Sequence, residues 1–232
     1  MFFPIGDDQV QGGHKAIFSY VILIINILVF VYEINLDDNA LMAFTFEYGA
    51  VPDYFLHGNH LHGLVTSLFL HGGWAHLLGN MLFLWVFADN IEATIGSFKF
   101  VVFYLLGGIA ATLFHGLIFP VSELPLIGAS GAIAAVLGAY LVLFPASRIR
   151  VWFLLILSSF NVPALVFLGL WIVNQFFSGY GSLGNPNVET SGVAYWAHIG
   201  GFIFGLIVGY FTKQAYQPKL GIELIDDEDE YV

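Results

Sequence analysis

The chain has 232 residues, of which 58% are apolar and only 10% carry a formal charge, whereas soluble domains average about 25% charged residues. This composition excludes an ordinary soluble domain and indicates an integral membrane protein with several spans, while the lack of cysteine excludes a disulfide framework. The formal net charge of −11 comes largely from loop acids and from the run 226–230, which we interpret as a solvated tail. We expect no nucleic-acid partner.

Apolar runs, taken in chain order, predict six transmembrane helices in an all-α, polytopic fold. The runs are 17–32, 74–88, 100–119, 130–144, 162–177 and 194–211. No signal or transit peptide is evident in the segment 1–16 before the first run. A further apolar stretch, 151–160, is too short to cross alone. We expect it to extend the fifth helix or to lie at the membrane interface.

The basic residues predict the orientation, because Lys and Arg gather on the cytoplasmic side of a membrane. If the chain has six spans, all of its lysines and arginines fall on one side of the membrane, whereas five or seven spans would place some on the other side. These basic residues are Lys15, Lys99, Arg148, Arg150, Lys213 and Lys219. We therefore expect both termini in the cytoplasm. The predicted parts are a cytoplasmic segment 1–16, a membrane domain 17–212 and an acidic cytoplasmic tail 213–232.

The opposite loop 33–73 is about forty residues long, and loops of this length are usually functional or disordered. Its many aromatic residues argue against disorder, so we predict an interfacial element partly buried in the outer leaflet. The loop also carries His57, His60 and His62. Their spacing lacks clear ligand geometry, so we predict no metal site there, and we expect no cofactor.

Ser130 opens the fourth run and His198 lies near the start of the sixth. Ionisable and polar groups inside a membrane are costly, so they are functional candidates. Each lies 15 residues from the cytoplasmic flank, or roughly 22 Å at about 1.5 Å per helical residue. A bilayer core of about 30 Å leaves both roughly 8 Å beneath the opposite surface. At equal depth, a serine nucleophile and a histidine base can meet.

Small residues predict that these two helices pack closely, because small side chains let backbones approach. The sixth run repeats glycine at 201, 205 and 209, and the fourth offers the pairs Gly131/Ala135 and Ala134/Gly138. Such packing would bring His198 to the Ser130 hydroxyl, whose proton it could accept. The helix N-terminus at Ser130 offers free N–H groups to a developing negative charge.

His76 and Asn80 lie four residues apart in the second run and so share one helix face. Either they donate hydrogen bonds to an oxyanion, or they are buried polar groups that serve helix packing. The two helix positions alone leave both alternatives open.

Three motifs, in this order along the chain, resemble the rhomboid family of intramembrane serine proteases over about residues 17–212. They are His71-x4-His76-x3-Asn80, Gly128-Ala129-Ser130-Gly131 and Ala197-His198-Ile199-Gly200-Gly201. The resemblance implies a Ser130–His198 dyad, with His76, Asn80 and the Ser130 N–H group around the oxyanion.

The resemblance also implies structural roles near the site for His71, Gly128, Gly131 and Gly201, an anchoring role for Glu92 in a cytoplasmic loop, and a membrane-embedded first loop at 33–73. The sequence departs from some members at Ala134, where they carry a tyrosine that stacks on the histidine. The aromatic–arginine pair of some first loops is also absent.

We therefore predict an endopeptidase that cleaves single-span membrane proteins within or near their transmembrane segments, in a prokaryotic plasma membrane. One alternative is a catalytically silent rhomboid-like protein that binds membrane clients. Another is a small transporter, although no acid or lysine lies in the middle of a span. The sequence predicts no particular oligomeric state.

Overall fold

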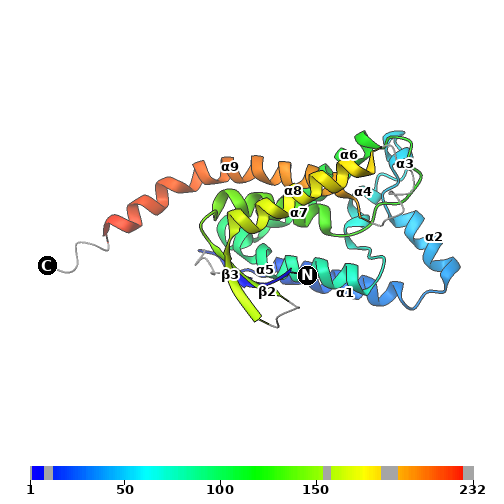
Figure 1. Ribbon diagram of the computed structural model, residues 1–232. Coiled ribbons are helices and arrows are strands. Elements are labelled where there is room, and N and C mark those ends of the chain that lie inside the picture. The colour runs from blue at the N-terminus through cyan, green and yellow to red at the C-terminus, as the bar shows by residue number, and fades with distance from the viewer. Residues whose placement is uncertain (1, 8–12, 154–157, 184–192, 227–232) are drawn as a thin grey trace.

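The computed structural model describes residues 2–7, 13–153, 158–183 and 193–226. This part of the chain is mostly helical, and each of the six apolar runs coincides with a helix (Figure 1). The six helices are α1 (Phe18–Glu33), α5 (Trp74–Ile95), α6 (Ser97–Ile118), α7 (Ser130–Leu143), α8 (Ala164–Ser182) and α9 (Tyr195–Asp226). Helix α9 passes the predicted boundary at 212, and residues 227–232 of the acidic tail lie outside the described residues.

Within the described residues, three helices are long and apolar enough to cross a membrane: α6, α8 and the stretch Tyr195–Ala215 of α9. Helices α1 and α7 are apolar but shorter. Helix α5 is long enough, but polar residues lower its mean hydropathy; they are Asn80, Asp89, Asn90 and Glu92. Large apolar side chains such as Leu117, Leu170 and Phe177 are exposed on the outside, as expected of a surface that faces lipid. The chain is a membrane protein.

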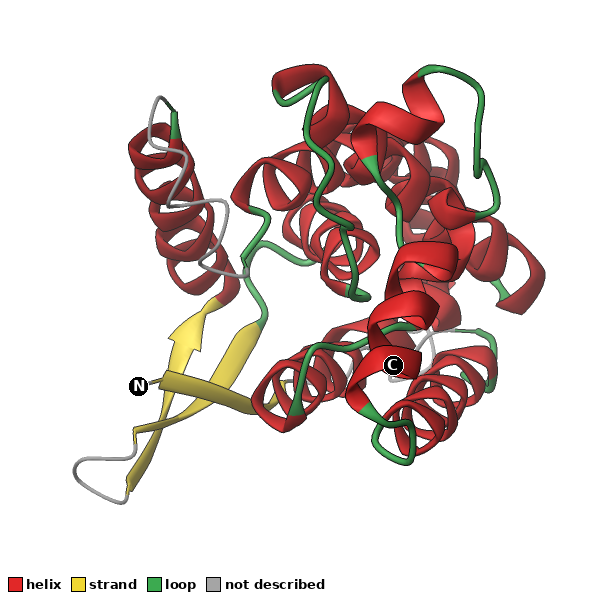
Figure 2. Ribbon diagram, turned by 90° about the vertical axis from the view of Figure 1, so that its right-hand side faces the viewer, coloured by secondary structure: helices red, strands yellow, loops and turns green. Residues whose placement is uncertain are grey.

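A small antiparallel sheet lies at one end of the helices (Figure 2) and corrects the all-α prediction. Its order is β1 (Phe2–Asp7), β2 (Arg148–Phe153), β3 (Ser158–Pro163). The prediction that 151–160 extends the fifth helix is therefore wrong. Ile149 and Val151 are buried while Arg148 and Arg150 are exposed, and this alternation is the period of a strand rather than of a helix.

The first strand ties the N-terminal segment to the helices. Asp7 accepts hydrogen bonds from the Tyr140 hydroxyl of α7 and from Asn90 Nδ2 of α5, the latter at 2.9 Å. The described part of segment 1–16 is thus integrated into the fold rather than being a free extension.

Helices α7 and α9 pack along a stripe of small residues. A Cβ atom added to Gly201 would overlap the backbone oxygen of Gly131, and one added to Gly205 would overlap that of Ala135. One turn further on, a Cβ on Gly209 would lie 2.9 Å from the Ala139 Cα. The two backbones are therefore in close contact at three successive points over about two helical turns, and the two helices run in the same direction.

The long first loop folds into short helices at the end of the molecule away from the sheet (Figure 1). They are α2 (Asp38–Tyr48), α3 (Pro52–Leu56), α4 (Gly63–Thr66) and the 3-10 turn η1 (Ser67–Phe69). Ala50 and Leu126 exchange backbone hydrogen bonds of 3.0 and 2.9 Å, and Gly128 N donates to Ser67 O at 2.8 Å. The first loop therefore holds the segment that leads into α7.

Candidate active site

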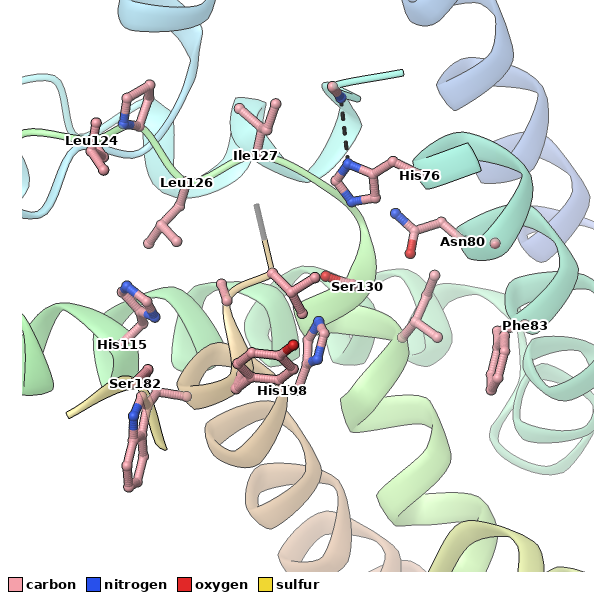
Figure 3. A pocket seen from close by; sticks show the side chains of 18 of the residues that line it. His76, Asn80, Phe83, His115, Leu124, Leu126, Ile127, Ser130, Ser182 and His198 are labelled. Atoms are coloured by element: carbon pink, nitrogen blue, oxygen red, sulfur yellow. Dashed lines mark hydrogen bonds between the residues drawn. The ribbon is translucent and has the colours of Figure 1, made fainter. Parts of the chain in front are cut away.

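A cavity of about 640 Å³ is lined by residues of the five helices α5 to α9 and of the segment before α7. Ser130, His198, His76 and Asn80 all line it (Figure 3). In that view Ser130 lies between His198 on one side and His76 and Asn80 on the other. The remaining wall is largely apolar; it includes Phe83, Leu124, Leu126, Ile127 and Trp171.

Ser130 is the first residue of α7, so its backbone N–H group has no partner within the helix. Gly128, two residues earlier, has a φ of +118°, in the region that favours glycine. A Cβ at Gly128 would also lie 2.6 Å from His76 Nε2. Gly128 therefore serves both the turn into α7 and the close approach of His76.

His198 is oriented by α8. Its Nδ1 lies 2.9 Å from Gln175 Oε1, and because that oxygen can only accept, Nδ1 carries the proton and Nε2 keeps its lone pair. The Trp171 ring lies beside the imidazole, with centroids 5.8 Å apart at 33°. Among the described residues no hydrogen bond joins His198 to the Ser130 hydroxyl, although the two side chains face each other in Figure 3.

His76 presents a ring N–H group to the cavity. Gly72 N donates to His76 Nδ1 over 3.4 Å (dashed line in Figure 3). With Nδ1 as acceptor, the neutral ring carries its proton on Nε2, the atom that faces Gly128.

Asn80 is held by His71, which is buried between α1 and α5. Asn80 Nδ2 lies 2.9 Å from His71 Nε2, and burial, together with the neighbouring His76, lowers the pKa of His71 to about 4. The neutral His71 therefore accepts from the amide, which keeps its second N–H for the cavity. His71 N also donates to the Glu33 carboxylate at 3.1 Å.

Two neighbours of His198 lie outside the three motifs. Gln175 is a polar residue on an apolar helix, 95% buried, and Trp171 precedes it by one turn on the same face. This four-residue spacing could have indicated from the sequence that Trp171 and Gln175 act together. Only the packing of α8 on α9 shows that both contact His198. Ala134, the departure from some rhomboids, is fully buried in α7, and the ring beside the histidine comes from Trp171 instead.

The other candidate residues lie apart from this cavity. Glu92 is buried at the opposite end of α5, where its carboxylate accepts from the backbone N–H groups of Ile17, Phe18 and Ser19 and from Ser97 Oγ. It therefore anchors the start of α1 as well as the turn between α5 and α6. His57, His60 and His62 lie in the first loop.

Ser130 at a helix N-terminus and His198 thus share one cavity with further hydrogen-bond donors inside a helical membrane protein. Residues 58–215 match the model of the Rhomboid domain. The chain belongs to the rhomboid family.

Two curated relatives align with the chain. It is 31% identical over 140 residues to Rhomboid protein 1, mitochondrial, of Saccharomyces cerevisiae, covering 59% of this chain and 37% of the relative. It is 33% identical over 139 residues to Rhomboid protease GluP of Bacillus subtilis, covering 60% of this chain and 23% of the relative. The chain thus aligns with well under half the length of each.

Proposed function

We propose that this protein is an intramembrane serine endopeptidase that cleaves single-span membrane proteins with a Ser130–His198 dyad. One observation carries the proposal: Ser130, His198, His76 and Asn80 line one cavity, and the hydrogen bonds of His76 and Asn80 leave each with an N–H group to donate. Membership of a family that includes a named protease supports it further.

In the first step, Ser130 Oγ attacks the carbonyl carbon of the scissile peptide bond and its proton moves to His198 Nε2. The negative charge that develops on the carbonyl oxygen is stabilised by three N–H donors: the Ser130 backbone, His76 Nε2 and Asn80 Nδ2. His198 then returns the proton to the leaving amine and the C–N bond breaks. The C-terminal fragment departs with a new amino terminus, and the N-terminal fragment stays bound as an acyl ester on Ser130.

In the second step, His198 Nε2 takes a proton from water, and the resulting hydroxide attacks the ester carbonyl. The Ser130–acyl bond breaks, the serine regains its proton from His198, and the second fragment leaves with a carboxylate. Gln175 keeps the same ring nitrogen available in both steps, because its oxygen holds the other ring proton.

A helical substrate hides its carbonyl groups in backbone hydrogen bonds and must unwind locally to be cut. We therefore propose single-span substrates that carry Gly, Ala, Ser or Pro near the outer leaflet. Incubating the purified protein with a panel of such substrates in liposomes, and mapping the products by mass spectrometry, tests this. Binding of the substrates without any product would favour the silent, client-binding alternative.

Replacing Asn80 by alanine should lower kcat roughly tenfold to a thousandfold, because one lost oxyanion donor costs about 2–4 kcal/mol of transition-state stabilisation. His76→Ala should act similarly, with little effect on KM in either case. Steady-state kinetics and thermal unfolding, measured together, check this. If turnover stays intact while the melting temperature drops, both residues serve helix packing alone.

Replacing Gln175 by leucine should lower kcat by roughly fivefold to thirtyfold, because a lost hydrogen bond of about 1–2 kcal/mol leaves the His198 ring free to adopt the wrong tautomer. KM should not change. Asn174→Leu on the same turn, whose side chain is exposed, is the matched control and should retain wild-type kcat. Equal kcat in the wild type, Gln175→Leu and Asn174→Leu would show that Gln175 does not assist His198 in catalysis.

The orientation with both termini in the cytoplasm of a prokaryotic plasma membrane stays a prediction. Because the natural chain has no cysteine, single cysteines can be labelled without background. A membrane-impermeant maleimide added outside intact cells should label Glu123→Cys and leave Lys99→Cys unlabelled until the cells are opened. The reverse pattern would invert the assignment.

A further inference from the structure

The three histidines of the first loop do not form one group. His57 lies at the end of α3, where its Nδ1 is 2.6 Å from the Asp53 backbone oxygen and 3.5 Å from the Asp53 carboxylate. His60 and His62 instead face Glu47, in the last turn of α2.

Glu47, His60 and His62 have the spacing of a metal-ligand set. One ligand atom from each can be chosen so that all three lie within 4.8 Å of one another. His60 Nδ1 is 3.9 Å from Glu47 Oε2, and His62 Nε2 is 3.7 Å from Glu47 Oε1. Ligand atoms around a tetrahedral zinc ion are about 3.3 Å apart. Binding would require these exposed side chains to rotate toward one another.

The backbone around the cluster is already fixed. Thr66 Oγ1 donates to Tyr48 O at 2.6 Å, and a Cβ on Gly63 would overlap the backbone oxygen of Gly49. These contacts press the end of α2 against the start of α4. His62 Nε2 lies 2.7 Å from the Glu47 backbone oxygen, so this nitrogen donates there and would have to give up that hydrogen bond and its proton to bind a cation.

His60 has an unusual backbone conformation, with a φ of +48°. Non-glycine residues are uncommon in this left-handed region, and asparagine, aspartate and histidine are the ones that adopt it most often. Its ring lies 5.5 Å from that of His62 and 5.4 Å from that of Tyr54.

We propose that Glu47, His60 and His62 bind a divalent cation of the zinc class. Two imidazoles and one carboxylate suit zinc, whereas magnesium prefers oxygen ligands alone. Water completes the coordination, since all three side chains are exposed. This reverses the expectation of no metal: the spacing of the histidines did not include Glu47, which reaches them from another helix.

The bound ion would link α2 to the connection between α3 and α4 and so stiffen the first loop. That loop holds the wall of the cavity through the hydrogen bonds between Ala50 and Leu126 and between Asp53 N and Ser122 O. The proposal does not rest on protease activity, because ion binding is measured directly.

The test uses the purified full chain in detergent, freed of metal by a chelator and titrated with zinc chloride in a calorimeter. The wild type should bind one zinc ion in a saturable step, with a rise in melting temperature, and magnesium chloride should do neither. Glu47→Gln and His60→Asn should weaken zinc binding by about tenfold or more. Asparagine is chosen because it tolerates the backbone at position 60.

His57→Ala is the matched control: it removes an exposed histidine of the same loop but leaves the cluster, and it should bind zinc like the wild type. If His60→Asn does not fold, Glu47→Gln decides alone. Wild-type zinc affinity in Glu47→Gln, an equal loss in His57→Ala, or no saturable binding in the wild type would each overturn the proposal.

Discussion

Ser130→Ala and His198→Ala should each reduce peptide cleavage to background, while both proteins still fold and insert into the membrane. The cavity wall also carries Ser122, Ser182, His76 and His115. The proposed mechanism assigns the attack to Ser130 and the proton transfer to His198, so none of these residues should substitute for them. Groups that act as one unit lose nearly all activity when either is removed. Product formation from a single-span substrate, followed by mass spectrometry, measures the effect.

A fluorophosphonate probe separates loss of chemistry from loss of fold. It should label wild-type protein at Ser130 and fail on Ser130→Ala, while both proteins show the same melting temperature. The neighbouring cavity residue Ser182 provides a control, since Ser182→Ala should remain active and labelled at Ser130. Undiminished proteolysis by Ser130→Ala or His198→Ala would contradict the proposal that these two residues form the catalytic dyad.

Gly201→Val should nearly abolish turnover and also lower thermal stability. Its side chain would collide with the backbone oxygen of Gly131, the residue after the nucleophile. The collision would force α9 away from α7 and carry His198 with it, and a displacement of about 1 Å at a reacting group can cost on the order of a hundredfold in rate. Single-turnover rates and melting temperatures should be measured on the same samples.

Gly209→Val is the comparison within the same stripe. It disturbs the contact with Ala139, two turns deeper, so it should cost stability with a smaller effect on the rate. Gly201→Ala serves as a milder change if the valine variant does not fold. Equal and small effects on turnover at positions 201 and 209 would mean that helix separation does not control the dyad.

The sequence predicted well those features that depend on one helix or on two matched helices. The small residues at 131, 135, 201 and 205 predicted the contact of α7 with α9, because small-residue spacing limits how two helices can meet. Gln175 was recognisable as a buried polar group, but its partner depends on how α8 is rotated against α9. The spacing of residues along α8 does not indicate how that helix is rotated against α9.

Two features were missed because each joins residues that lie on different elements of the chain. The β2–β3 hairpin pairs with a strand at residues 2–7, and an alternation as short as Arg148 to Val151 is weak evidence beside a long apolar run. Glu47 meets His60 and His62 only because α2 and α4 are pressed together. Sequence spacing describes neighbours on one element and is silent about such long-range contacts.

The buried carboxylate of Glu92 has a consequence for the order in which the molecule assembles. The start of α1 has no side-chain cap of its own, and its first three N–H groups are satisfied by a residue that lies more than seventy positions later. During synthesis α1 leaves the ribosome well before Glu92. Until then the N–H groups at its start can form hydrogen bonds only with other groups, such as water or lipid headgroups. These N–H groups therefore gain their carboxylate partner only after residue 92 has been synthesised, although α1 is the first of the six helices to be made.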